Sequence, residues 1–243
     1  MQNAMRIAMM SGKRGPKPPA YGGLCFTAEA DNSSVQLTVV GSAPPAVTLV
    51  KSFDGVNWEA YAVGEVIDLP SVGDFVYLAA GEGGNEAFGL GQTSYHQFVI
   101  NGLVAASGDI TSIRRFDLEQ TTLASRCYHS MFEGCTGLTS APELPATTLA
   151  GRCYRSMFYG CTGLTSAPEL PATTLGRNSY IRMFEGCTNL SLIKVRLTTW
   201  GASSSSNWVS GVSPTGTFYK PTALPEEYGA SKIPTGWTVV NIN

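Results

Sequence analysis

The sequence predicts a mixed fold, in which an N-terminal β-sandwich is followed by a short solenoid of strand/helix coils. Seven short apolar segments lie between residues 22 and 107, and a 26-residue repeat begins at residue 123. The chain has 243 residues, with 14% charged residues and 10% aromatic residues, which argues against a disordered chain. The net charge of −2 gives no global basic field, so we expect no nucleic-acid partner.

Residues 1–21 form the first of three expected parts, an extended basic and proline-rich anchoring arm. This segment carries four positive charges and no acid, and its prolines and glycines prevent a self-supporting fold. Two interpretations remain open, a solvated tail and a docking arm that becomes ordered on a partner. The candidate anchoring residues are Arg6, Lys13, Arg14 and Lys17.

The N-terminal residues do not have the continuous apolar stretch of a secretion signal. We therefore expect the protein to stay where it is made or to leave by cell lysis. Uninterrupted apolar runs are only a few residues long throughout the chain, so we expect no membrane insertion.

Residues 22–107 are expected to form an immunoglobulin-like β-sandwich. Apolar residues alternate from Val35 to Val39, as in a half-buried strand, and Asp54 followed by Gly55 is a hairpin signal. Seven short strands with turn signals between them favour the immunoglobulin-like arrangement, with Trp58 in its core. The expected strands are 25–30, 35–40, 46–53, 57–62, 65–69, 75–80 and 95–101.

The repeat predicts a solenoid over residues 108–243, with a C-terminal cap from about residue 196. Residues 123–148 and 149–174 differ at only three of 26 positions, and a third copy starts at Leu175. A worn fourth copy is suggested at residues 207–213. Units with such a period cannot bury an apolar face alone, so they should stack with a parallel sheet on one side.

Each copy is expected to contain a short helix followed by a strand. Leu149, Cys153 and Met157 are spaced four apart and would form one apolar stripe on a helix, and Gly160 suits its left-handed end. Residues 164–167 would then form the strand, and residues 168–171 a proline-framed connector. We expect one buried methionine per coil beside a phenylalanine: Met131 with Phe132, Met157 with Phe158, and Met183 with Phe184.

The cysteines of the repeats form two expected ladders, Cys127 with Cys153, and Cys135 with Cys161 and Cys187. Zinc sites usually contain closer cysteine pairs than this spacing provides. Equivalent residues in stacked coils are about 5 Å apart, which is near disulfide reach. We favour buried free thiols, while disulfides and a metal remain the alternatives.

The repeated segment Leu-Ala-x-Arg-Cys-Tyr-x-Ser-Met-Phe-x-Gly-Cys-Thr-Gly-Leu-Thr-Ser-Ala-Pro-Glu-Leu-Pro-Ala-Thr-Thr resembles the BspA-like leucine-rich repeats. The resemblance is strong over about residues 123–195, and the segment from Gly216 resembles the terminal segment that often follows such repeats. Such repeats are common in surface proteins of Bacteroides-type gut bacteria and in proteins of their phages. The resemblance implies a leucine-rich-repeat scaffold, and without an export signal it favours a phage protein.

No set of residues in the sequence forms a recognisable catalytic constellation, so we expect no enzyme activity, metal or cofactor. His96 and His129 have no identifiable nucleophile or metal partner. Four repeat residues are candidates for a ligand-binding ladder: Arg126, Arg152, Glu143 and Glu169. They are interpreted either as solvated side chains or as a stripe that binds an anion or a glycan.

These observations predict a non-enzymatic virion structural protein of a tailed phage, as a head or tail fibre or decoration protein. The arm would attach it to other virion proteins of the capsid or tail, and the repeats would serve adhesion to a host surface glycan or protein. We also expect a homo-oligomer. The alternatives are a bacterial cell-surface adhesin and a carbohydrate-binding accessory module.

Overall fold

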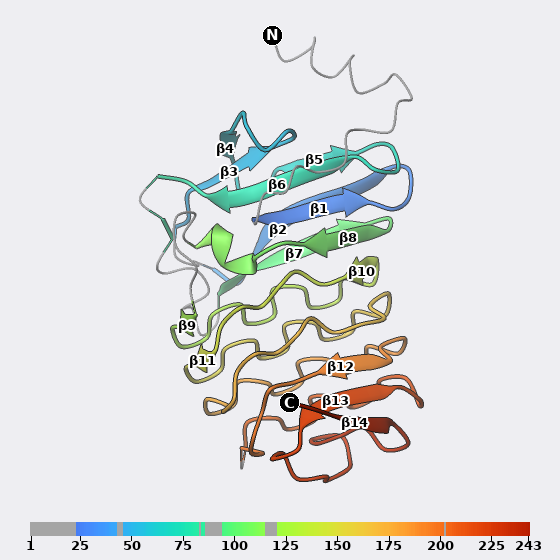
Figure 1. The fold of residues 1–243 in the computed structure, drawn as a ribbon. Coiled ribbons are helices and arrows are strands. Elements are labelled where there is room, and N and C mark those ends of the chain that lie inside the picture. The colour runs from blue at the N-terminus through green and yellow to red at the C-terminus, as the bar shows by residue number, and fades with distance from the viewer. Residues whose placement is uncertain (1–22, 43–45, 83, 86–93, 115–120, 202) are drawn as a thin grey trace.

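The computed structural model describes residues 23–42, 46–82, 84–85, 94–114, 121–201 and 203–243. A β-module at one end continues into a solenoid of about five coils (Figure 1). Within these residues the one helical element is the short 3-10 helix η1 (Ile110–Ile113). The predicted anchoring residues Arg6, Lys13, Arg14 and Lys17 lie outside the described residues.

The β-module consists of two antiparallel sheets that share one apolar core. One sheet has the strand order β8-β1-β6-β3-β4 and the other has the order β5-β2-β7. Phe26 on β1 meets Phe98 on β7 across this core, with ring centroids 4.9 Å apart. The strands are β1 (Leu24–Ala28), β2 (Ser33–Val40), β3 (Leu49–Ser52), β4 (Glu59–Tyr61), β5 (Val66–Leu69), β6 (Phe75–Ala80), β7 (Tyr95–Asn101) and β8 (Val104–Ser107). Each of the seven expected strands overlaps one of these, and β8 is additional.

The order of these strands differs from that of an immunoglobulin domain. There the first, second, fourth and fifth strands form one sheet, and the third, sixth and seventh form the other. Here the first and fourth strands lie in the sheet of the third and sixth, and the seventh lies beside the second in the other sheet. The alternation of apolar residues indicates which face of a strand is buried but not which sheet the strand joins. The sequence could therefore predict the strands without their order.

The hairpin predicted at Asp54 is confirmed, and it connects the antiparallel strands β3 and β4. The Asp54 carboxylate accepts the backbone N–H of Asn57 over 2.7 Å, and Gly55 has a left-handed φ of 74°. Trp58, which we expected in the core, is instead half-buried and packs beside Tyr77, outside the main core.

The predicted solenoid is confirmed. We number its coils 1 (122–147), 2 (148–173), 3 (174–198), 4 (199–222) and 5 (223–243). Short parallel strands pair between coils at two separate places, and Leu138 of coil 1 pairs with Val104 of β8, so the stack grows directly from the β-module (Figure 1). The strands are β9 (Thr122–Leu123), β10 (Leu138–Ser140), β11 (Thr148–Leu149), β12 (Leu192–Lys194), β13 (Thr217–Pro221) and β14 (Thr238–Ile242).

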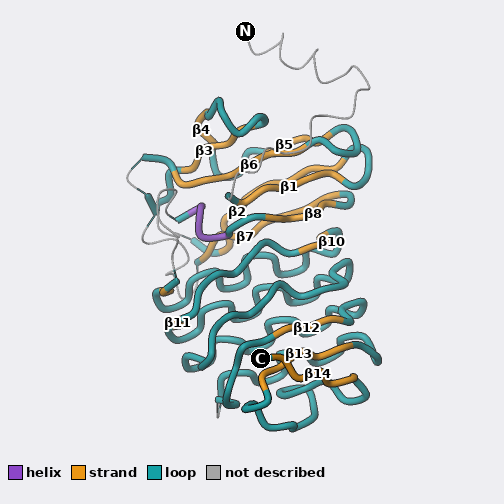
Figure 2. Tube along the Cα trace, viewed as in Figure 1, coloured by secondary structure: helices purple, strands orange, loops and turns teal. Residues whose placement is uncertain are grey.

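The helices predicted for the coils are wrong, because the described part of the solenoid contains no helix (Figure 2). Coil 2 instead forms consecutive turns in which alternate residues are left-handed, with φ of 65° at Arg152, 59° at Tyr154 and 53° at Ser156. An α-helix requires right-handed φ at every residue. In these turns the Met157 N–H bonds within the coil to the carbonyl oxygen of Tyr154 (3.1 Å), whereas the Phe158 N–H bonds to the next coil. We call this part of each coil the turn segment.

The buried ladder of methionines and phenylalanines is confirmed. Each of the three methionines has an exposed fraction of 1% or less, and the phenylalanine beside each is fully buried. Phe158 stacks on Phe132 and on Phe184, with centroids 5.5 Å apart in both pairs. In coil 4 the buried Trp208 continues this column, and its carbonyl oxygen accepts the Phe184 N–H over 2.8 Å. The weakly similar fourth copy at residues 207–213 is therefore part of a coil of the solenoid.

Candidate functional site

The four candidate ladder residues belong to two different parts of the coils. Arg126 and Arg152 lie in the turn segments of coils 1 and 2. Glu143 and Glu169 lie in the connectors that follow the strand positions of the same coils. The structure therefore divides them into an arginine pair and a carboxylate pair.

Both glutamates take part in contacts that hold the stack together, Glu169 through its carboxylate and Glu143 through its backbone. Glu169 is exposed and accepts hydrogen bonds from Lys194 Nζ and Arg196 Nε of the next coil, both over 2.9 Å. These bonds, that from Lys194 foremost, lower the pKa of Glu169 below its ordinary value. The backbone of Glu143 joins coil 1 to the β-module, because its N–H donates to the Gly108 carbonyl oxygen over 2.8 Å. Glu169 is thus already neutralised by its own chain.

Three arginines on coils 1 and 2 form the surface that we call the arginine surface: Arg126, Arg152 and Arg155. Arg126 and Arg152 occupy equivalent positions of successive coils. Backbone hydrogen bonds fix this register, since the Arg126 N–H donates to the carbonyl oxygen of Gly151 and the Ser130 N–H to that of Arg155, both over 2.9 Å. Adjacent coils in such a stack are about 5 Å apart. The backbone therefore holds the three residues close together on neighbouring coils.

The arginine surface has no acidic partner within the described part of the chain. None of its three guanidinium groups forms a hydrogen bond or an ion pair with a described residue. Arg182 in coil 3 is different, because its Nε donates to Glu185 Oε2 over 2.8 Å and its guanidinium lies 4.5 Å from the centre of the Tyr159 ring. The positive charge of the arginine surface is thus left for a group outside the described chain.

His129 lies within the field of this surface. Its ring packs edge-on against Tyr95 of β7, with centroids 5.1 Å apart. Burial, followed by the charges of Arg155, Arg126 and Arg152, lowers the pKa of His129 to about 4. His129 is therefore neutral at pH 7, and its pKa responds to the charge of the three arginines.

The backbone at Arg126 and Arg152 is strained for residues of this type. Their φ values are 66° and 65°, in the left-handed region that arginine rarely adopts. The equivalent position of coil 3 is Asn178, with φ of 62°, and asparagine tolerates this region better. Arg126 is half-buried and Arg152 is exposed, so burial compensates little of this strain. The same left-handed φ recurs at the buried Tyr154 and Ser156, so this conformation is a feature of the turn segment as a whole.

Sequence reasoning did not include His129 and Arg155 in the ladder. A signal for them exists, because the two residues occupy the same position of successive 26-residue copies. The positions at which the copies differ were treated as variation, although here they combine a histidine with an arginine on adjacent coils.

The six cysteines are buried and free. Burial raises the pKa of Cys135, Cys153 and Cys187 to about 12. Over the described ranges, no group of three or more His, Cys, Asp or Glu side chains is arranged to hold a metal ion. The thiols therefore act as apolar packing groups and weak hydrogen-bond donors.

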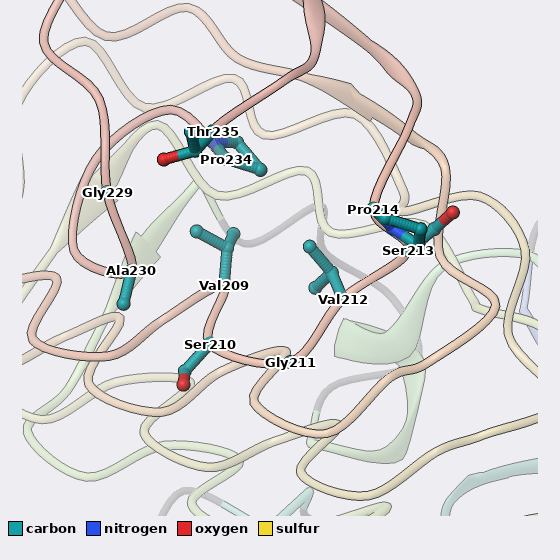
Figure 3. Close-up of a pocket in the computed structure, with 10 residues that line it drawn as sticks. All are labelled: Val209, Ser210, Gly211, Val212, Ser213, Pro214, Gly229, Ala230, Pro234 and Thr235. Atoms are coloured by element: carbon teal, nitrogen blue, oxygen red, sulfur yellow. The ribbon is translucent and has the colours of Figure 1, made fainter.

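A second candidate site is a hollow of about 200 Å³ between coils 4 and 5 (Figure 3). Its walls combine valine and proline side chains with hydroxyl groups and glycine backbone. The lining residues are Val209, Ser210, Gly211, Val212, Ser213, Pro214, Gly229, Ala230, Pro234 and Thr235.

The part of the chain that the structure describes contains no helix long and apolar enough to cross a bilayer. Comparison of the chain with protein-family models, curated proteins and solved structures gives no match.

Proposed function

We propose that this protein is a non-enzymatic display scaffold whose solenoid adheres to anionic groups of a surface glycan through the arginine surface. The observation that carries this proposal is the set of Arg126, Arg152 and Arg155, whose backbone is held in register on adjacent coils and whose guanidinium groups have no acidic partner in the described chain. Guanidinium groups bind carboxylate and sulfate oxygens through paired hydrogen bonds, and stacked arginines suit a ligand with repeated negative charges.

The architecture supports a display role. Parallel strand pairing from Val104 to Leu138, and hydrogen bonds from each coil to the next, join the β-module and the solenoid into one continuous stack. Such stacks present extended surfaces for binding.

Further parts of the proposal rest on sequence features. The basic composition around Arg6, Lys13, Arg14 and Lys17 supports attachment to other virion proteins, and the resemblance to BspA-like repeats supports a tailed-phage virion as the location. The 26-residue coils with recurring buried leucines support the leucine-rich-repeat assignment. The shared core of two sheets supports a sandwich related to immunoglobulin-like domains.

Calorimetric titration with a sulfated oligosaccharide of the heparin type tests the adhesion proposal. The double variant Arg152→Gln/Arg155→Gln should bind at least about tenfold more weakly, because each lost charge-assisted hydrogen bond is worth about 1.5–3 kcal/mol. The control is Arg196→Gln, since Arg196 is already bonded to Glu169. Binding that is equal in the wild type and the double variant would refute the arginine surface as the ligand site.

His129 provides a second readout, because a bound anion should offset the three arginine charges and raise its pKa from about 4. His96 on β7 is an internal control, since its pKa is lowered by burial and not by these arginines. An NMR titration of both rings, with and without the oligosaccharide, should show a change at His129 alone. An unchanged pKa of His129 in the saturated complex would place the ligand elsewhere.

A further inference from the structure

A column of backbone N–H groups runs along the turn segments and ends at coil 4. One left-handed glycine in each of coils 1 to 3 donates its N–H to a carbonyl oxygen of the next coil. The pairs are Gly134 to Tyr159 (2.7 Å), Gly160 to Glu185 (2.8 Å) and Gly186 to Ser210 (2.8 Å).

Gly211 is the fourth member of this column. Its φ is 72°, like the 71–79° of the other three, and a side chain at Gly211 would lie 3.7 Å from the Cα of Gly186. The Gly211 N–H has no hydrogen-bond partner among the described residues, and neither has the N–H of Val212. At the position equivalent to Val212 in coil 3, the Cys187 N–H bonds to the Phe184 carbonyl oxygen over 3.1 Å. The hydrogen bonds equivalent to those of Gly186 and Cys187 are thus both missing from the described chain at the point where the stack stops repeating.

The next carbonyl oxygen of the column would be expected in coil 5, but the hollow between coils 4 and 5 lies there instead (Figure 3). Contact between these coils continues as far as Val209, whose N–H donates to the Ala230 carbonyl oxygen over 3.1 Å. Beyond Val209 the chain of coil 5 diverges, and Gly211 and Val212 both line the open space.

Adjacent backbone N–H groups beside a left-handed residue form a concave arrangement that binds anionic oxygens. In coils 1 to 3 the glycine N–H is already bonded to a carbonyl oxygen of the next coil, and the N–H that follows it is bonded within its own coil. We propose that in coil 4 it binds a carboxylate, specifically that of an acidic monosaccharide held in the hollow. The N–H groups of Gly211 and Val212 bond the carboxylate oxygens.

The walls of the hollow fit the rest of such a sugar. Val209, Val212 and Pro234 provide an apolar surface for the face of the ring, and Ser210 and Thr235 add polar residues to the lining. A volume of about 200 Å³ is below the range of about 300–1,000 Å³ typical of drug-sized ligands, so it suits one sugar unit. The described residues that line the hollow include no lysine or arginine, so a singly charged carboxylate suits it better than a more highly charged group.

The hollow lies on coils 4 and 5, whereas the arginine surface lies on coils 1 and 2, so each can be tested without the other. Titration of the 15N-labelled protein with sodium glucuronate, observed by amide NMR, reads the proposed contacts directly. The Gly211 and Val212 amides should shift in a saturable manner, several-fold more than the Gly186 and Cys187 amides, which are already hydrogen-bonded. Sodium chloride at equal ionic strength, and glucose, which lacks the carboxylate, should leave Gly211 unshifted. A Gly211 shift no larger than that of Gly186, or an equal shift with chloride or glucose, would overturn the proposal.

A variant with a carboxylate inside the hollow completes the test. The Ala230 side chain is exposed and lines the hollow, so Ala230→Glu should abolish the glucuronate shifts by repulsion or by occupying the site (Figure 3). Ala223→Glu is the matched control, since Ala223 is exposed and does not line the hollow. Thr235→Glu repeats the test at another exposed lining position of coil 5 and serves if Ala230→Glu does not fold. Wild-type glucuronate shifts in a folded Ala230→Glu or Thr235→Glu variant would count against the site.

Discussion

The Cys161 thiol donates a hydrogen bond to the carbonyl oxygen of Phe132, 29 residues earlier, over a distance of 2.9 Å. The Cys187 thiol bonds in the same way to the carbonyl oxygen of Phe158. These bonds run from each coil back to the preceding one. They explain why cysteine suits this position, since a small apolar side chain with one weak donor both fills the core and contacts the buried carbonyl.

We predict that the repeat cysteines react very slowly with alkylating reagents in the native protein. The thiolate is the reactive form, and burial raises the pKa of Cys135 and Cys187 to about 12, so almost none is present at pH 8. Mass spectrometry after treatment with iodoacetamide should show little modification in native buffer and complete modification in guanidinium chloride without reductant. Two or more disulfides per chain would contradict this prediction and favour an exported protein.

The methionine ladder predicts a large loss of stability for Met157→Asp. Met157 is fully buried in the core of the stack, so the substitution buries an unpaired charge at a cost of several kcal/mol. Urea unfolding measures the change. Thr188→Asp is the control, because Thr188 is exposed and should change the free energy of unfolding by less than about 0.5 kcal/mol. Equal effects of the two substitutions would contradict the register of the coils.

The prediction of this register was right and the prediction of helices was wrong for the same reason. A 26-residue period fixes which residues are equivalent, so the burial of Met131, Met157 and Met183 could be predicted from the sequence. Apolar residues spaced four positions apart fit a helix, but they also fit turns in which left-handed residues alternate with right-handed ones. The side chains of Arg152 and Tyr154 do not signal a left-handed backbone. Hydrogen bonds between coils stabilise that conformation, and these appear only once the coils are stacked.

The candidate site, like the fold, could be predicted from the sequence only in part. Arg126 and Arg152 were recognisable in the sequence because they recur at one position. The effect of Arg155 on His129 depends on coil-to-coil packing. The hollow beside Gly211 could not be predicted, since it arises where coil 5 departs from the repeat and its sequence no longer matches the earlier copies.

We predict that Tyr154→Phe raises stability. The Tyr154 hydroxyl is buried without a hydrogen-bond partner among the described residues, while its ring stacks on Tyr128 with centroids 5.9 Å apart. The substitution keeps the stacked ring and removes a polar group whose burial costs about 1–3 kcal/mol. Thermal unfolding should show a higher midpoint for Tyr154→Phe, and no change for the exposed control Tyr228→Phe. A lower midpoint for Tyr154→Phe would mean that the hydroxyl is bonded to an internal water.

Deletion of residues 1–20 tests the proposed attachment to a particle. The β-module and the solenoid share an extensive apolar core of their own, so the melting midpoint should stay nearly unchanged. Incorporation of the protein into virions should be lost, since the basic residues of the arm would no longer contact an acidic groove. Quantitative electrophoresis of purified particles measures occupancy. Full occupancy with the truncated protein would remove the anchoring role of the arm.

The low pKa of His129 predicts a specific loss of stability in acid. Burial and the neighbouring arginines lower its pKa from 6.5 to about 4 in the folded chain, so the unfolded chain binds this proton more readily. The resulting stabilisation is complete above about pH 6.5 and is lost as the pH falls through 4.

Between pH 6.5 and 4 the free energy of unfolding should therefore decrease less in His129→Gln than in the wild type, by on the order of 1–2 kcal/mol. Arg155→Gln should act in the same direction, because among the three arginines Arg155 has the largest effect on the pKa of His129. Arg177→Gln is the control, since Arg177 is exposed and is not among the charges that act on this ring. Urea unfolding at constant ionic strength gives the three pH profiles. If His129→Gln and Arg177→Gln have the same profile, the arginine surface does not act on His129 in solution.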